Sequence, residues 1–164
     1  MNQPVPTRND ALEFGRRTRR NFEFIESVKQ NKPDAPVHVV TQLTLSLLGI
    51  VVFPYEKLDS TIFAKTIAEI TAEGWLGWSI TLDSPKEGAS RTETLGNLLW
   101  HLRNAVAHGR LMFNSDSARL SEVAITAEDG PNKRAAVNWR AEIEGCHLRT
   151  FCLRFLEFVD GIVG

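Results

Sequence analysis

The apolar residues of this chain recur mostly at the spacing of amphipathic helices, so they predict a mainly α-helical protein. A first helix begins after a cap at Asn9 or Asp10 and runs to about Gln30. The pattern predicts further helices at about 39–52, 62–70, 92–108 and 144–162. The segment 92–108 is the clearest, because at about 100° per residue its leucines and Val106 form one apolar stripe.

Two places in this helical pattern leave alternatives open. Residues 50–53, with the sequence Ile-Val-Val-Phe, could form a strand, and Pro54 ends the segment in either case. Residues 73–85 form an irregular, aromatic-rich connection. Its Trp75 and Trp78 could stack on nucleobases or bind a partner, although tryptophans more often pack in a core or an interface.

The period changes after Gly109, where apolar and polar residues alternate in two segments, around 120–125 and 135–143. The residues between them, Asp-Gly-Pro-Asn at 129–132, are typical of a turn. The sequence therefore predicts a β-hairpin at about 118–142, inserted into a single helical domain that spans residues 1–164.

Composition and charge narrow the class of protein. With 164 residues, of which 43% are apolar and 24% charged, the chain can bury a sizeable core. Nineteen Lys and Arg against twenty Asp and Glu leave a formal net charge of −1, which excludes a protein that coats nucleic acid through bulk charge. Any polyanion must then be met by a local basic patch.

Several classes of site and location have no sequence signal. The longest nearly apolar run, 43–53, is about half of the ~20 residues that cross a bilayer, so we expect no membrane span. The N-terminal residues lack the pattern of a secretory signal, and Cys146 and Cys152 are poorly placed for a mutual disulfide; both features favour a cytoplasmic location. Motifs for zinc or nucleotides are absent, so we expect no metal and no cofactor.

The informative motif is Arg103-Asn104 followed by three residues and His108, near the end of the clearest predicted helix. Asn97, His101, Asn104 and His108 lie four, three and four residues apart, so they form a polar strip in which Asn104 can touch His108. Arg103 lies about 140° around the helix axis from His108. Its guanidinium therefore reaches the imidazole only by bending around the helix, or a second copy of the chain supplies the missing group.

These residue types suit cleavage of an RNA phosphodiester without metal. Such cleavage deprotonates a 2′-hydroxyl, stabilises extra negative charge on phosphorus and protonates the leaving 5′-oxygen. His108 precedes the helix-ending Gly109 and can act as acid or base near neutral pH. Arg103 can clamp a phosphate through its planar fork, and Asn104 can orient the imidazole or donate to a phosphate oxygen.

In type and spacing, Arg103, Asn104 and His108 resemble the signature of the HEPN superfamily (higher eukaryotes and prokaryotes nucleotide-binding domains). The layout is also similar: a helical core, the motif late in the chain, and a closing C-terminal helix. The hairpin departs from the minimal four-helix pattern and would be an elaboration. The resemblance implies a metal-independent endoribonuclease that acts as a homodimer with a composite active site.

The same resemblance implies a biological role and keeps two alternatives open. Many HEPN ribonucleases are toxins or phage-defence effectors, so an antitoxin protein is a candidate partner. Some members lack activity, and the chain could instead be a binding module for RNA, a nucleotide or a protein. The polar strip could also lie in the seam of a purely structural dimer.

Other polar residues are weaker candidates for this site. His101 could line the same face as His108, although a solvated or dimer-facing histidine is the more common case. Arg110 could assist phosphate binding or could equally be a favourable cation at the helix C-terminus. Glu56 could approach the motif from another helix. The first helix carries a basic cluster that could hold RNA phosphates or could pair with nearby acids such as Glu13 and Glu23. This arginine cluster consists of Arg16, Arg17, Arg19 and Arg20.

Overall fold

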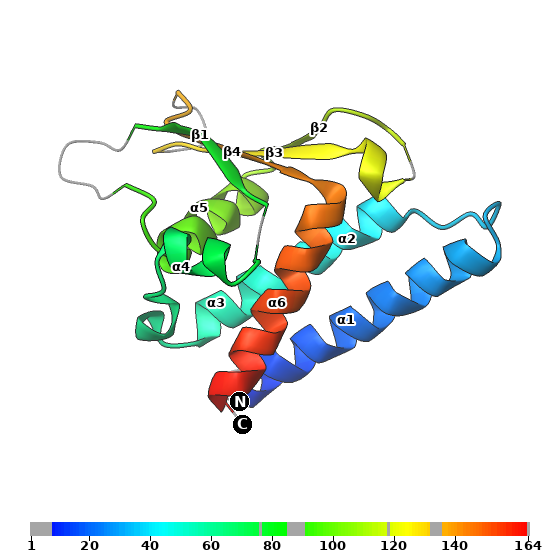
Figure 1. Cartoon of the computed structure of the whole chain (residues 1–164), viewed down its shortest axis with the longest axis horizontal. Helices are drawn as coiled ribbons and strands as arrows, with labels where there is room; N and C mark the ends of the chain where they lie inside the picture. Colours follow the sequence, from blue (N-terminus) through cyan, green and yellow to red (C-terminus); the bar gives the residue numbers. More distant parts are fainter. Residues whose placement is uncertain (1–7, 76, 85–90, 118, 132–135, 164) are drawn as a thin grey trace, which may run out of the picture.

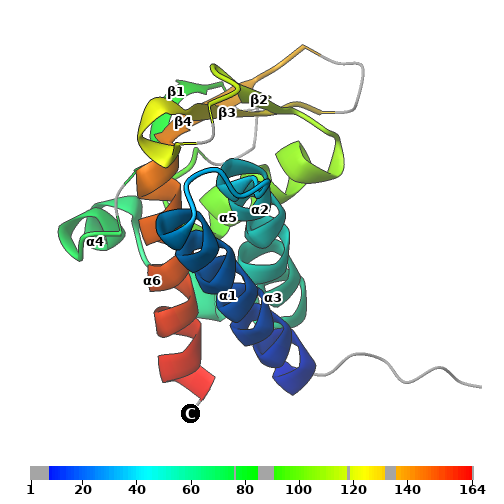
Figure 2. The same ribbon diagram turned by 90° about the vertical axis from the view of Figure 1, so that its right-hand side faces the viewer.

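The computed structural model places a four-stranded sheet across one end of a group of helices (Figures 1 and 2). It describes residues 8–75, 77–84, 91–117, 119–131 and 136–163. The long helices of this group are α1 (Arg8–Asn31), α2 (Val39–Leu47), α5 (Leu95–Ala107) and α6 (Gly145–Val163). The expectation of a mainly α-helical protein is confirmed, and every long predicted helix except 62–70 corresponds to one of them.

The first two predicted helices differ in detail from those of the structure. Helix α1 already includes Asn9 and Asp10, so neither residue is its cap. Residues 50–53 form no strand; α2 continues through a π-helical turn, η1 (Leu48–Val52), into α3 (Phe53–Lys57). Pro54 therefore does not end the helix. It occupies the first turn of α3, where a residue without a backbone N–H costs no intrahelical hydrogen bond.

The predicted helix 62–70 is divided by a break at residues 64–66. A 3-10 turn, η2 (Ser60–Phe63), begins after Asp59, and α4 (Ile67–Ala72) begins after Thr66. The Thr66 hydroxyl accepts from the Glu69 N–H, and the Glu69 carboxylate accepts from the Thr66 N–H, which is a complete capping box. This local signal starts a new helix and outweighs the continuous apolar pattern.

The sheet is larger than the hairpin that the sequence predicts. Its strands, in the spatial order β1-β4-β3-β2, are β1 (Ser79–Asp83), β4 (Trp139–Glu144), β3 (Ala124–Asp129) and β2 (Leu111–Phe113). All neighbours are antiparallel, and β3 and β4, which contain parts of the two alternating segments, are the inner pair. β3 follows the short turn η3 (Leu120–Glu122). The expected separate insertion is thus part of a larger sheet. One edge, β1, comes from the segment predicted to be irregular, and the other, β2, from residues for which no element was predicted.

One apolar core joins the sheet to the helices. In the predicted stripe of α5 the four leucines, Leu95, Leu98, Leu99 and Leu102, are buried and Val106 is half-buried, and α5 packs on β3. Trp75 is buried against Phe151 and Phe158 of α6, and Trp78 meets the edge of Phe151. Trp75 therefore packs in the core and is not available to stack on a nucleobase. Cys152 lies in the same core, where burial raises the pKa of its thiol to about 12.

The helical run Val39–Lys57 is long and apolar enough to cross a membrane by length and composition. It packs against α1, α5 and α6, however, and many of its side chains, among them Leu43 and Val51, belong to the core. A buried core helix satisfies the same criterion, so this run does not indicate a membrane span.

The buried stripe of α5 predicts a large effect of truncation. Leu102→Ala should lower the free energy of unfolding by about 2–5 kcal/mol, because Leu102 is fully buried and a cavity would remain. The matched control is Leu45→Ala on α2, whose side chain is 56% exposed and should cost less than about 0.5 kcal/mol. Urea unfolding measures both; equal losses would contradict this packing.

Candidate functional site

The motif lies on α5, and both ends of this helix are set by local sequence. Thr94 and Asn97 form a capping box at the N-terminal end, so the Asn97 side chain serves the cap instead of the predicted polar strip. At the other end the helix stops at His108, and Gly109 follows with a φ of 66°. That left-handed conformation favours glycine, which explains why the helix ends directly after the motif.

Arg103 is held by two neighbours. Its Nε donates to Oε1 of Glu56, on α3, at 2.7 Å, and its Nη1 donates to Oδ1 of Asn104 at 2.9 Å. The Arg103 and Glu56 side chains are 41% and 42% exposed. A guanidinium has five N–H donors, so an exposed Arg103 retains donors for an anionic ligand. The sequence-based suggestion that Glu56 approaches the motif from another helix is confirmed.

Asn104 is buried and faces the sheet. Its Nδ2 donates to Oδ2 of Asp129, the last residue of β3, at 3.1 Å. The expectation that the Asn104 side chain touches His108 is wrong, because the amide is engaged by Asp129 and Arg103. Only the backbones of Asn104 and His108 are linked, through the His108 N–H and the Asn104 carbonyl at 2.9 Å.

The side-chain carboxylate of Asp129 is almost fully buried and has three hydrogen-bond partners. Its side chain is 3% exposed; a hydrogen bond of 2.9 Å also joins Oδ2 to Nδ1 of His101, and Oδ1 accepts from the Gly130 N–H at 2.7 Å. Burial alone raises the pKa of Asp129, but the hydrogen bonds from His101, Asn104 and Gly130 outweigh it and lower the pKa below its ordinary value. The carboxylate is therefore ionised at neutral pH.

His101 is fixed by rings as well as by Asp129. Its imidazole lies flat on Trp139 of β4, with ring centroids 4.5 Å apart and an interplanar angle of 4°, and Trp100 meets it edge-on. Trp139 is fully buried, and its Nε1 donates to Oγ1 of Thr92 at 2.9 Å. His101 is thus neither a simple surface residue nor a contact of His108.

His108 and Arg110 flank the helix end differently. His108 is exposed, and within the described residues no hydrogen bond or ion pair reaches its imidazole. In particular, the chain does not join the Arg103 guanidinium to this imidazole. Arg110 lies beside the end of β3, where one of its guanidinium nitrogens is 2.9 Å from the position that a Cβ would take at Gly130.

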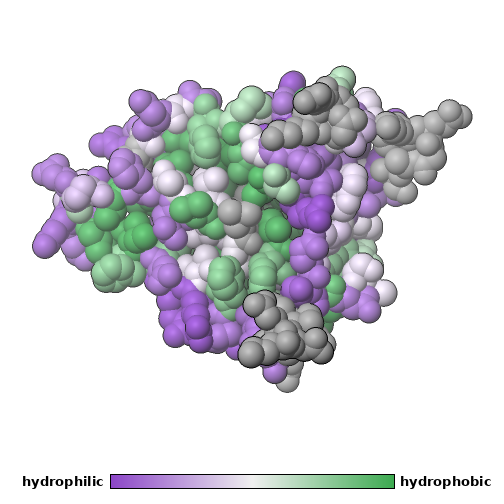
Figure 3. Space-filling model, turned by 180° about the vertical axis from the view of Figure 1, so that it is seen from behind, coloured by the Kyte–Doolittle hydropathy of each residue, from purple (hydrophilic) through white to green (hydrophobic). Residues whose placement is uncertain are grey.

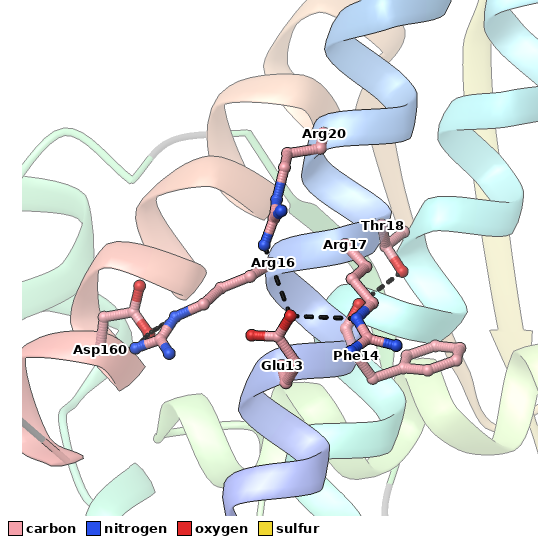
Figure 4. Close-up of polar contacts among 7 residues, drawn as sticks. All are labelled: Glu13, Phe14, Arg16, Arg17, Thr18, Arg20 and Asp160. Atoms are coloured by element: carbon pink, nitrogen blue, oxygen red, sulfur yellow. Dashed lines mark hydrogen bonds and ion pairs between the residues drawn. The ribbon is translucent and has the colours of Figure 1, made fainter.

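The arginine cluster lies on α1 beside the C-terminal part of α6, toward the end of the helices that is away from the sheet (Figures 1 and 4). Arg17 and Arg20 bind Glu13, Arg16 binds Asp160 of α6, and Arg19 binds Glu23. The sheet and the C-terminal end of α5 lie at the other end of the helices (Figures 1 and 2). The predicted pairing with Glu13 and Glu23 is present.

Sequence reasoning missed Asp129 as a site residue and placed it in a turn. A signal existed: Ile125, Ala127 and Asp129 alternate along β3, and all three are buried. An acid that continues the inward face of a strand needs donors in the core, because an unpaired buried charge is costly. The neighbouring helix supplies them through His101 and Asn104.

One group of residues outside the motif has the composition of a metal site. Glu144, at the end of β4, and Cys146 and His147, at the start of α6, each bring a ligand atom to within 4.8 Å of the others. Glu144 and His147 are exposed, and an ion pair of 3.7 Å joins them.

Comparison with protein families gives a match over nearly the whole chain. The family model described as HEPN pEK499 p136 matches residues 1–163. No curated protein and no solved structure gives a significant match.

The lowered pKa of Asp129 predicts how stability changes with pH. A group with a lower pKa in the folded state stabilises the protein above its unfolded pKa, and this contribution is lost as the pH falls through the folded pKa. At pH 7, Asp129→Asn should therefore lower the free energy of unfolding by about 2 kcal/mol, since it weakens bonds to a buried charge. The difference should shrink below pH 3.8, the ordinary pKa of this carboxyl. Urea unfolding of both proteins from pH 7 to 3 tests this, and a difference that grows on acidification would contradict it.

Proposed function

Because the chain belongs to the HEPN family described as pEK499 p136, we propose that it is a metal-independent endoribonuclease that acts as a homodimer. The observation that carries the proposal is the division of roles at the end of α5. Arg103 is oriented by two hydrogen bonds and still exposed, whereas His108 stands at the helix end with its imidazole in solvent. A fixed anion-binding group and an accessible acid or base are the two parts that the reaction needs.

In this proposal the 2′-oxygen of RNA attacks the adjacent phosphorus and the bond to the 5′-oxygen breaks. The products carry a 2′,3′-cyclic phosphate and a 5′-hydroxyl. Arg103 binds the non-bridging oxygens, where negative charge grows in the transition state. One His108 takes the proton of the 2′-hydroxyl, and a second His108, from the partner copy, gives a proton to the 5′-oxygen.

Glu56 does not prevent a phosphate from binding at Arg103. Both side chains of this ion pair are about two-fifths exposed, and such pairs contribute about 1 kcal/mol or less. A bidentate phosphate can therefore displace the carboxylate at little cost. Before RNA arrives, the hydrogen bond to Glu56 helps to orient the guanidinium.

A homodimer would complete the site. Arg103 and His108 share no contact within the described chain, so a second copy can bring an imidazole to the guanidinium. Apolar side chains are available for association: Figure 3 shows them gathered across one face of the molecule. On α5 and β2 the exposed large ones are Trp100, Met112 and Phe113. In the cell, the proposed ribonuclease would act in the cytoplasm as a toxin or phage-defence effector and would be inhibited by an antitoxin protein.

The motif predicts metal-free cleavage that depends on two side chains. Purified protein should cleave a mixed RNA pool in EDTA, and Arg103→Ala or His108→Ala should reduce the rate at least about 100-fold, because each removes charge stabilisation or proton transfer. Product ends, assayed for cyclic phosphate, identify 2′-hydroxyl attack.

The matched control for that experiment is His147→Ala, which removes an exposed histidine on α6 and should leave cleavage unchanged. Undiminished cleavage by a folded His108→Ala variant would remove His108 from the mechanism. Saturable RNA binding by the wild type without any product would assign the chain to the non-catalytic HEPN modules instead.

The arginine cluster predicts a salt-dependent contribution to RNA binding. Arg17 and Arg20 are 71% and 68% exposed and share one acceptor, Glu13, so they can exchange it for RNA phosphates. The double variant Arg17→Ala/Arg20→Ala should weaken binding and lower the slope of log Kd against log salt by about 1.4, or ~0.7 for each lost phosphate contact. Arg119→Ala, an equally exposed arginine paired with Glu122, is the control. An unchanged slope in the double variant would show that the cluster only forms ion pairs.

A further inference from the structure

We propose that Asp129 is a positioning residue of the candidate site: it fixes the direction of the Asn104 amide and thereby holds the Arg103 guanidinium ready for a phosphate. Asp129 lies on β3, outside the helix that carries the motif. Its effect on catalysis rests on the proposed ribonuclease function, whereas its effect on the geometry of Arg103 can be measured without any activity.

The direction of the Asn104 amide follows from the chemistry of its two neighbours. An ionised carboxylate only accepts hydrogen bonds, so the Asn104 NH2 must face Asp129, at 3.1 Å. A guanidinium only donates, so the Asn104 oxygen must face Arg103, at 2.9 Å. If Asp129 lost its charge, the amide could turn over, and Arg103 would then meet an NH2 group that cannot accept from it.

The carboxylate itself is anchored independently of Asn104. Oδ1 accepts from the Gly130 N–H, and Oδ2 accepts from Nδ1 of His101. The backbone of Asp129 pairs with Trp139 on β4, and the Trp139 ring stacks on His101. The sheet therefore sets where Oδ2 lies, and Asn104 adapts to it.

The ionised state of Asp129 also makes a prediction about His101. Because the carboxylate has no proton to give, the proton of their hydrogen bond belongs to Nδ1 of His101. The ¹⁵N chemical shifts of the wild-type protein report this directly. A proton on Nδ1 of His101 supports the proposal; a proton on Nε2 alone would mean that Asp129 donates, and would overturn it.

The decisive variants are Asp129→Asn and Glu128→Gln. Glu128 is the adjacent carboxylate on the same strand, is 15% exposed and binds Arg140 instead of α5. The Glu128→Gln variant therefore controls for the loss of a largely buried negative charge on β3. In Asp129→Asn the NMR signals of the Asn104 side-chain amide and the Arg103 Nε–H should move, whereas in Glu128→Gln they should stay. Equal responses in the two variants would overturn the proposal.

A double-mutant cycle of Asp129→Asn and Asn104→Ala tests the role in catalysis, with kcat and KM measured separately for each variant. Asp129→Asn and Asn104→Ala should each lower kcat about 10- to 100-fold, a range typical of residues that orient a catalytic group. If Asp129 acts through Asn104, the kcat of the double variant should lie within about 3-fold of the kcat of the less active single variant. Losses that multiply, or wild-type kcat in Asp129→Asn, would overturn this role.

The two proposals fail in distinguishable ways. A wild-type protein that does not cleave RNA contradicts the ribonuclease function, and the NMR signals of Asn104 and Arg103 then decide the positioning role alone. If Asp129→Asn does not fold, the protonation of His101 in the wild type decides it. Cleavage by the wild type together with unmoved Asn104 and Arg103 signals in Asp129→Asn would refute the positioning role only.

Discussion

The buried carboxylate of Asp129 is the constraint on which the motif region depends. A charge with 3% of its side chain exposed is tolerated only when donors surround it, and here two of the three come from α5. His101 and Asn104 are three residues apart, so both side chains face the sheet from one side of the helix. This arrangement fixes the rotation of α5 about its own axis, and with it the direction of Arg103. The leucine stripe on the core side of the helix is compatible with small rotations, whereas hydrogen bonds of about 3 Å to a single oxygen are not.

Helix α5 itself was predictable because its signals are local and agree with one another. The leucine period, the polar residues before Leu95 and the glycine after His108 all describe one helix, and the structure contains it. The prediction was wrong where two signals compete over a few residues. Pro54 reads as a helix end, but the π-helical turn before it lets a new helix begin with the proline in its first turn. The apolar run of 62–70 reads as one helix, but the Thr66 capping box divides it.

The site was only half predictable, and the reason is that its second half comes from the sheet. Arg103, Asn104 and His108 share one helix and could be related through its period. The partners of Arg103 and Asn104 are Glu56 and Asp129, 47 and 25 residues distant along the chain, and only the tertiary fold brings them together. For the same reason the polar strip failed as a unit: once Asp129 engages Asn104, the amide is no longer available to His108. A polar strip on a helix indicates which residues share a face, whereas the neighbouring element decides which of them interact.

The contrast between Asn104 and His108 also explains how a rigid and an adaptable group can share one turn of helix. The Asn104 side chain is buried and hydrogen-bonded to Arg103 and Asp129, so replacing these bonds by bonds to water is costly. Its fixed position therefore restricts the movement of the Arg103 guanidinium. His108 follows at the point where the helix gives way to Gly109, and its side chain has solvent on the side away from the core. An acid or base must meet its substrate and exchange protons with water, which an exposed helix end allows. In the proposed mechanism Arg103 must not reorganise as charge develops on the phosphate, and its hydrogen bond to the buried Asn104 opposes such movement. The sheet therefore does more than cover the helices: it supplies the fixed charge against which the proposed clamp is held.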